Sequence, residues 1–418
     1  MQLLDSVNAV LWGPFTVILI LICGIFHTIK SGFIQLRLTG KLGGSGENRL
    51  RAVTSALAAS MGTGNITGCA AAIASGGVGA VFWMWISAAL GMAIAYSENK
   101  LGAEYSAKYP HRQGGPMLYM EKGLGSRRLA RFYAAVCLCA ALCMGCTSQA
   151  GAFAEAVSSQ TGVPPLLCAV FAAIITGAVI FSSEKVSVGV MNAAEKIVPA
   201  MGVLYTVGCI VLIIYSGSSV TASLFRIVSC AFTPEAVCGG AVGVTVQKAV
   251  SVGLRRGIFS NEAGMGSSVL IHSEADFGSP EGAGAWAAFE VFLDTVVCCT
   301  LTALAVMTLP ELPEGDVISY AFEHTLGRAG GIFVCVCICL FAWAAILGWS
   351  SCGEKSLSYL TSKGTVIYKL LVCVFTAAGG LISMEAVLGV SDIINCMMMI
   401  PNLLVITALT IYSDNKNT

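Results

Sequence analysis

The sequence predicts an all-α protein that crosses a membrane many times. Only 11% of its 418 residues are charged and 56% are hydrophobic, whereas soluble domains carry about 25% charged residues. Apolar segments close to the ~20 residues of a spanning helix recur along the whole chain. These observations predict a polytopic helical membrane protein that forms a single transmembrane domain over residues 1–418, with the lipid bilayer as its surroundings.

Eleven apolar segments are long enough to be spans. They lie at residues 11–33, 51–75, 79–104, 129–157, 164–183, 195–216, 236–271, 283–309, 327–352, 365–384 and 387–412. The formal net charge is zero, so the composition indicates neither a nucleic acid nor an acidic partner. The 18 cysteines include several in apolar runs, and we expect them to be small reduced side chains in helices.

Basic residues gather in the odd-numbered connections between these segments. They are Arg37, Lys41, Arg49 and Arg51 after the first segment, Lys108, Arg112, Lys122, Arg127 and Arg128 after the third, and Lys355 and Lys363 after the ninth. The even-numbered connections hold only Arg226 and Arg328. Because cytoplasmic loops carry the excess of Lys and Arg, this pattern places the N-terminus outside and the C-terminus inside the cell (plasma) membrane.

Two of the predicted spans are interrupted by glycines and polar residues. The second span contains "GTGN" at residues 62–65, and the seventh contains "SNEAGMG" at residues 260–266. The two interruptions lie five spans apart. Since five is odd, consecutive five-helix units enter the membrane with opposite orientation. We therefore predict an extra N-terminal helix and cytoplasmic loop in residues 1–50, followed by inverted repeats in 51–217 and 218–418.

An interrupted helix at membrane depth favours a binding site. Its free N–H and C=O groups are costly in lipid unless a ligand, an ion or buried water satisfies them. Gly62 and Gly64 are expected to permit unusual dihedrals and the close approach of a small ligand. Close packing of helices through small residues is the alternative interpretation. A dinucleotide-binding loop is disfavoured, because no strand precedes the motif and Thr67 occupies the third glycine position.

Six motifs together resemble the alanine or glycine:cation symporter family, also called the sodium:alanine symporters. In order, they are "MGTGNITGCAAAIASGGVGAVFWMWISAALGMA" (61–93), "GGPMLYMEKGLG" (114–125), "KIVPAMGVLYTVG" (196–208), "RRGIFSNEAGMGS" (255–267), "VFLDT" (291–295) and "GWSSCGE" (348–354). The resemblance implies a leucine-transporter-type fold of two inverted five-helix repeats. It also implies uptake of a small neutral amino acid, such as alanine or glycine, driven by a sodium gradient.

The resemblance further implies where the substrate carboxylate binds. Thr63, Gly64 and Asn65, which form the first interruption, would receive it. Exposed amides and side-chain donors converge there, and amide groups at the start of a half-helix suit an anion.

Four other residues complete the implied substrate site. Gln149 would contact the amino group through its amide oxygen, and Ser260 and Asn261 would supply further polar contacts. Trp349 would close the side-chain end of the pocket. An interhelical hydrogen bond is the alternative role for Gln149, and packing against lipid or at the membrane interface is the alternative for Trp349.

The chain departs from the family at the implied cation site. Sodium-coupled members hold the ion between carbonyls of the first broken helix and a Ser-Thr pair ahead of the tryptophan, whereas "FAWAAILGW" (341–349) places Ala344 and Ala345 there. A methyl group cannot coordinate a hard cation that requires oxygen ligands. Carbonyls near Ala58 and Met61 would remain. We therefore expect weak or absent sodium coupling, with proton-coupled or uncoupled transport instead. Retained sodium coupling is the alternative.

Several charged residues lie within or beside the predicted spans. Asp294 and Glu262 are ionisable groups at membrane depth, where such groups are functional candidates. We expect Arg255 or Arg256 to neutralise one of them. Near the inner end of the third span, we expect an interface cluster, which comprises Glu98, Lys100 and Glu104.

Other functional classes are less consistent with the sequence. An enzyme would need a nucleophile, base or metal constellation in one cavity, and we find none. The four histidines, His27, His111, His272 and His324, show no ligand spacing, so we predict no histidine metal centre. A channel would be expected to show repeated pore-lining polar rings. We therefore predict a secondary transporter without an organic cofactor, while a sensor built on a transporter fold remains the alternative.

Overall fold

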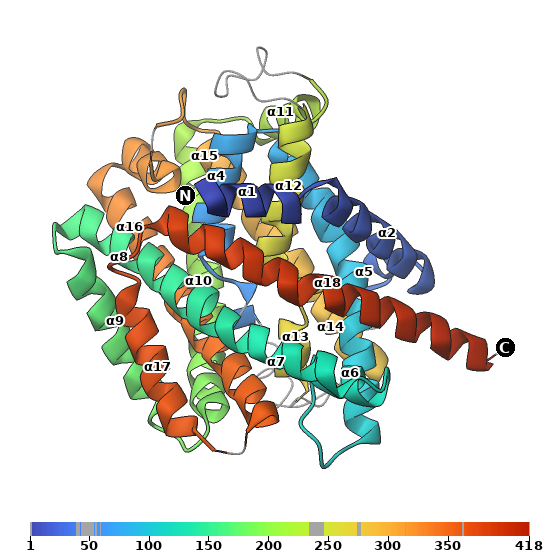
Figure 1. Cartoon of the computed structure of the whole chain (residues 1–418). Coiled ribbons are helices and arrows are strands. Elements are labelled where there is room, and N and C mark those ends of the chain that lie inside the picture. The colour runs from blue at the N-terminus through green and yellow to red at the C-terminus, as the bar shows by residue number, and fades with distance from the viewer. Residues whose placement is uncertain are drawn as a thin grey trace.

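The computed structural model describes residues 2–38, 42, 54, 57–58, 60–233, 246–273, 277–313, 315–361 and 363–417. This described part is helical and contains no strand (Figure 1). Seven of its helices are long and apolar enough to cross a membrane. Together with the shorter helices α9 (Pro165–Ile180) and α17 (Thr365–Ala378) and the two interrupted helices, they account for the eleven predicted spans.

The first half of the chain follows the predicted order of elements. Its elements are α1 (Gln2–Leu11), α2 (Pro14–Lys30), η1 (Ile34–Leu36), η3 (Thr63–Asn65), α4 (Thr67–Gly76), α5 (Ala80–Lys108), α6 (Pro116–Lys122), α7 (Arg127–Ala140), η4 (Ala141–Ser148), α8 (Gln149–Thr161), α9 and α10 (Val186–Ser216). The segments α7, η4 and α8 are continuous, and η4 is a π-helical stretch within them. Most of the predicted start of the second span, residues 51–56, lies outside the described residues.

The second half of the chain also contains an interrupted helix. Its elements are α11 (Val220–Cys230), α12 (Val246–Asn261), α13 (Ser267–His272), α14 (Pro280–Val291), η6 (Phe292–Cys298), α15 (Cys299–Val306), α16 (Val317–Leu360), α17 and α18 (Met384–Asn417). Residues 236–245 of the predicted seventh span lie outside the described residues. The sequence did not predict α11. Helix α16 begins ten residues before the predicted start of the ninth span. That predicted start, at residue 327, coincides with a kink in the helix at Gly327 (φ 68°).

Small residues let the central helices approach closely. Helix α5 packs against α12 and α14. A Cβ atom at Gly253 of α12 would lie 2.4 Å from the carbonyl oxygen of Ala80, and one at Gly257 would lie 2.6 Å from the Cβ of Ser87. Such residues are typical of helix contacts in membranes. The close contact fixes the second interrupted helix against α5.

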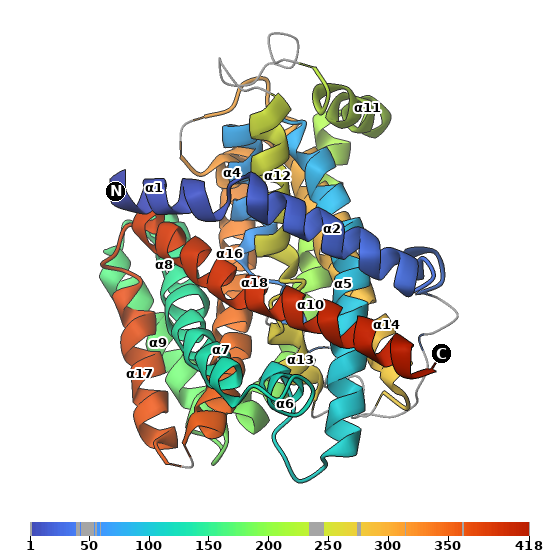
Figure 2. The ribbon, with the colours of Figure 1, turned by 45° about the vertical axis from the view of Figure 1, so that its right-hand side comes forward.

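A second group of helices surrounds α16. Helix α16 packs against α10 and against the continuous segment α7–η4–α8, while α9 packs against α17. Helix α18 runs obliquely across the bundle beside α1 and α2 (Figure 2). The largest buried side chains of the region between α10 and α16 include Tyr205 and Phe341, whose rings lie 5.6 Å apart. The two interrupted helices lie between α5 and α16.

The cysteines are mostly, but not all, reduced. Sixteen of the cysteines that the structure describes are free thiols, as the sequence predicts. Cys230 is disulfide-bonded, so the prediction is wrong for this residue. Cys230 is the last residue of α11, which precedes the seventh span.

Candidate functional site

The first interruption is a single short turn held by close packing. After Gly62, residues Thr63–Asn65 form the 3-10 turn η3, and α4 begins at Thr67. Gly62 has an extended backbone (φ −94°, ψ −169°), and neither Gly62 nor Gly64 has a positive φ. The expectation that these glycines supply unusual dihedrals is therefore wrong.

Steric crowding explains the two glycines. A Cβ atom at Gly62 would lie 3.2 Å from both the Cβ of Ala345 and the Oε1 of Gln149. A Cβ atom at Gly64 would lie 3.3 Å from the ring of Phe259. Three other helices thus approach the backbone of the first break within van der Waals distance. The packing interpretation accounts for both positions.

The second interruption, by contrast, depends on backbone conformation. Between α12 and α13, Glu262, Gly264 and Gly266 adopt φ values of 53°, 82° and 80°. Glycine adopts this region readily, while a glutamate does so only at a cost. A non-glycine residue in this conformation is typical of functional sites, where the surrounding contacts hold it. These surroundings include Trp349 Nε1 and Ser267 Oγ, which donate to the Glu262 carboxylate over 3.0 and 2.7 Å.

A buried polar cluster joins the two breaks. Asn65 donates through Nδ2 to Asp294 and accepts at Oδ1 from the Ser260 hydroxyl. Ser260 also donates to Asp294 Oδ2 over 2.8 Å, and Thr295 donates to the same oxygen over 3.0 Å. Thr302 Oγ1 donates to the backbone oxygen of Asn65 over 2.8 Å. Two of the predicted site residues, Asn65 and Ser260, therefore meet in one network organised by Asp294.

Gln149 links the first break to α8. Its Oε1 accepts from the backbone N–H of Thr63 over 3.0 Å and from the Thr63 hydroxyl over 2.9 Å. Because Gln149 follows the π-helical stretch directly, the widened turn sets the position of its side chain. The amide oxygen that the sequence assigned to a substrate amino group is bonded to Thr63 in this structure.

Two further predicted residues lie at the second break. Asn261 accepts at Oδ1 from the N–H of Ala263 over 3.0 Å. Trp349 is buried, and its side chain packs on Gly145, where an added Cβ would lie 2.2 Å from the Cβ of Trp349. The structure thus brings Trp349 to Glu262 in the second break.

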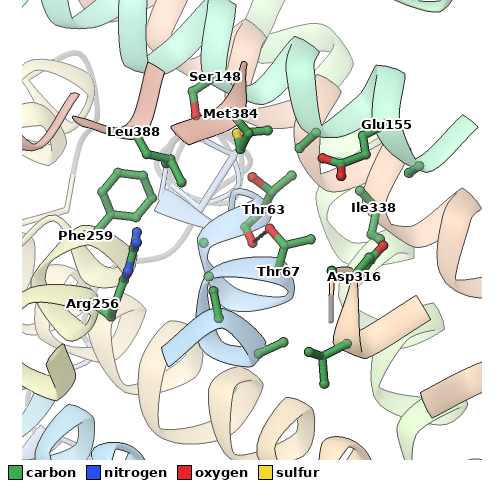
Figure 3. Close-up of a pocket in the computed structure, with 18 residues that line it drawn as sticks. Thr63, Thr67, Ser148, Glu155, Arg256, Phe259, Asp316, Ile338, Met384 and Leu388 are labelled. Atoms are coloured by element: carbon green, nitrogen blue, oxygen red, sulfur yellow. Dashed lines mark hydrogen bonds between the residues drawn. The ribbon is translucent and has the colours of Figure 1, made fainter. Parts of the chain in front are cut away.

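A cavity of about 250 Å³ lies beside the first break. Among the predicted substrate residues, Thr63 and Gly64 line it. Figure 3 shows Arg256 and Phe259 on one side of the cavity, Glu155 and Asp316 on the opposite side, and Thr63 between them. The cavity also reaches the start of α16.

The walls of this cavity carry opposite charges. The guanidinium of Arg256 lies on one wall, 5.8 Å from the ring centre of Phe259, and the carboxylates of Glu155 and Asp316 lie on the other. This arrangement suits a small zwitterion, whose carboxylate and ammonium groups have opposite charges. Sequence reasoning missed Glu155, although an ionisable side chain inside an apolar span was the available signal.

The predicted cation position consists of apolar side chains. Ala344 and Ala345 of α16 are each 1% exposed, and Ala58 and Met61 are also buried. The contact of Ala345 with the position of Gly62 places this part of α16 against the first break. The side chains of all four residues lack an oxygen atom, so backbone carbonyls would have to supply any cation ligands at these positions.

The charge pairing that the sequence predicts for Arg255 or Arg256 is wrong. Arg255 pairs with Asp392 of α18 at 3.8 Å, and Arg256 faces the cavity, so neither neutralises Asp294 or Glu262. Arg256 and Arg255 precede Glu262 by six and seven residues, which is about 9 Å or more along a helix, and are too distant to pair with it. Neutral hydrogen-bond donors contact both carboxylates instead.

Glu98 does not belong to the interface cluster that the sequence predicts for it with Lys100 and Glu104. Lys100 lies 3.9 Å from Glu104 and 2.7 Å from Glu281, but Glu98 is fully buried. It accepts from the N–H of Gly264 over 3.3 Å and from Asn402 over 3.0 Å. Glu98 points toward the second break because the close packing of α5 and α12 buries that face of α5.

The fold and these two interrupted helices define a secondary transporter. The chain matches the family described as the sodium:alanine symporter family over residues 1–415. It therefore belongs to the sodium:alanine symporter family.

The relatives and a solved structure agree with this assignment. An uncharacterized transporter of Haemophilus influenzae is 35% identical, with 98% of this chain and 93% of the relative covered. The sodium/alanine symporter AgcS of Methanococcus maripaludis is also 35% identical, with 96% and 93% covered. The crystal structure of MhsT in complex with L-phenylalanine superposes with a TM-score of 0.57 at 16% identity, covering 86% of this chain and 88% of that one. This likeness confirms the leucine-transporter-type fold.

Proposed function

We propose that this amino-acid transporter takes up a small neutral amino acid, such as alanine, glycine or serine. The observation that carries the proposal is the cavity beside the first break, where Arg256 lies opposite Glu155 and Asp316. A zwitterion fits these walls in one orientation, with its carboxylate toward Arg256 and its ammonium toward the two acids. Thr63 and Gly64 then offer a hydroxyl and a backbone without side-chain bulk to the bound molecule.

The proposal extends to the coupling ion and to the orientation. With Ala344 and Ala345 at the predicted cation position, sodium coupling is weak or absent, and a proton gradient or the substrate gradient alone drives uptake. The basic connections support an outside N-terminus and an inside C-terminus. The disulfide of Cys230 supports the same orientation, because it lies in a connection assigned to the outside.

The substrate class is tested by binding to the purified protein. We expect alanine, glycine and serine to compete for one saturable site. Glutamine, leucine and phenylalanine should compete at least about tenfold more weakly, a difference of about 1.4 kcal/mol. Scintillation proximity with labelled alanine measures the competition. Saturable binding of leucine or phenylalanine without binding of alanine or glycine would show that the assigned substrate class is wrong.

A further inference from the structure

Three buried ionisable side chains extend from the second break to the inner end of α13. Glu262 lies in the break, Glu290 lies on α14, and His272 is the last residue of α13. Their exposed fractions are 7%, 4% and 5%. Ionisable residues in this setting are rare, and chains of Asp, Glu and His are typical of proton relays in transporters.

Glu262 has hydrogen-bond donors but no basic partner among the described residues. Its two carboxylate oxygens accept from Trp349 and Ser267, one each, and the ion pairs of the described part do not include it. A buried carboxylate without a counter-ion is destabilising. Binding of a proton removes that charge and leaves a group that can still hydrogen-bond with both neighbours.

A small cavity separates Glu262 from Glu290. Its volume is about 10 Å³, and both glutamates line it together with Ser60, Asn261 and Ser268. This volume is close to that of one water molecule measured with a water-sized probe. Asn261, which is 5% exposed, has an Nδ2 without a hydrogen-bond partner. A water in this cavity can accept from Asn261 and connect the two carboxyl groups.

Glu290 connects this cavity to His272, whose neighbour in the chain lines a second cavity. Its Oε1 lies 2.9 Å from Nε2 of His272, and Nδ1 of His272 has no partner. The next residue, Ser273, lines a second cavity of about 350 Å³. Arg112, Lys185, Lys355 and Glu354 also line this inner cavity, and the basic residues place it on the cytoplasmic side.

We propose that Glu262 binds the coupling proton and that Glu290 and His272 pass it to the inner cavity. This inference rests on the proposed function in its proton-coupled form. The proton leaves the Glu262 carboxyl for the bridging water, which gives a proton to the Glu290 carboxylate. Glu290 transfers it to Nε2 of His272, and the resulting imidazolium releases a proton from Nδ1 to water. Rotation of the imidazole ring then turns Nε2–H away from Glu290, and the ring returns to the starting tautomer by giving the Nε2 proton to water and taking one at Nδ1.

Other ionisable groups surround Glu262 and the helix that follows it. Asp294 of η6, Glu98 of α5 and Cys137 of α7 lie near the Glu262 carboxylate, while Tyr133 of α7 and Cys352 and Lys355 of α16 bond to backbone carbonyls of residues 265–270. Lys355 donates to the carbonyl of Leu270 over 2.8 Å. The ion pairs of the described part do not include one between Lys355 and Glu262, and the acidic and neutral groups cannot neutralise a carboxylate there, so a bound proton balances the charge.

The test measures whether protons enter proteoliposomes together with alanine. Proteoliposomes that contain a trapped pH-sensitive dye and no sodium are given alanine, and internal acidification is followed. We expect Glu262→Gln, Glu290→Gln and His272→Gln each to reduce the initial acidification rate at least tenfold. Alanine–alanine exchange needs no net proton transfer, so we expect it to persist in these variants and to show that they are folded.

Two substitutions off the route serve as matched controls. His27→Gln changes a buried histidine whose Nε2 lies 3.2 Å from Thr407, and Glu121→Gln changes a carboxylate that accepts from Tyr359 over 2.6 Å. Both should keep wild-type acidification. Wild-type alanine uptake without acidification, or full acidification in Glu262→Gln, overturns the proton route but leaves amino-acid transport intact. Absence of alanine uptake by the wild type overturns both proposals.

If Glu262→Gln also loses alanine–alanine exchange, the Glu290→Gln and His272→Gln variants decide whether the proton route exists. Loss of acidification with retained exchange in Glu290→Gln and His272→Gln supports the route. Retained acidification in both of them overturns it.

Discussion

Alanine affinity is expected to fall about tenfold to a hundredfold when Asn65 is replaced by alanine. Asn65 is the one residue of the first break that bonds to both Asp294 and Ser260 across the interface between the breaks. The substitution leaves a buried carboxylate short of a donor, which costs about 1–3 kcal/mol. The loss disturbs the turn that carries Thr63 and Gly64 into the cavity.

Binding of labelled alanine to purified Asn65→Ala measures this effect. Asn8→Ala is the matched control, because Asn8 is also buried and donates one hydrogen bond, to the carbonyl of Gly389, far from both breaks. Size-exclusion profiles and thermal unfolding show whether both variants are folded. Binding by folded Asn65→Ala as tight as that of the wild type would exclude a role for this network in substrate binding.

A steep sodium dependence is expected to appear in the double variant Ala344→Ser, Ala345→Thr. The substitutions return two hydroxyl groups to a part of α16 that contacts the first break at Gly62. Hydroxyl and carbonyl oxygens are the ligands that a hard cation requires. Ser351 cannot supply the missing oxygen in the wild type, because seven residues of helix displace it about 10 Å along the axis from Ala344.

The comparison uses alanine affinity in sodium and in choline at equal ionic strength. We expect the ratio of the two affinities to rise at least tenfold in the double variant relative to the wild type, which corresponds to about 1.4 kcal/mol of coupling. Ala342→Ser places a hydroxyl at another buried position of the same helix and should leave the ratio unchanged. An unchanged ratio in the folded double variant would show that these positions do not form a cation site.

The two breaks could be predicted because local composition determines them. Glycines and polar residues inside apolar spans identify residues 62–65 and 260–266, and both segments are non-helical or tightly turned in the structure. The physical cause differs between them. Neighbouring helices crowd Gly62 and Gly64, whereas Gly264 and Gly266 adopt positive φ, and sequence alone does not distinguish these causes.

Partners of buried polar groups could not be predicted, because they are distant in the sequence. Asn65 and Asp294 are 229 residues apart, and Glu98 and Asn402 are 304 residues apart. The carboxylate of Asp294 or Glu262 was expected to pair with Arg255 or Arg256. Instead, Arg255 pairs with Asp392 and Arg256 lines the cavity. The role of Glu155 depends in the same way on a cavity that only the packed helices create.

Uptake of alanine by the wild-type protein under defined gradients distinguishes proton coupling from sodium coupling. Proteoliposomes are given an inward sodium gradient, an inward proton gradient or neither, with the membrane potential held at zero by potassium and valinomycin. We expect the proton gradient to drive alanine accumulation above equilibrium and the replacement of sodium with choline to change uptake little. Accumulation that requires sodium and does not respond to the proton gradient would contradict this expectation.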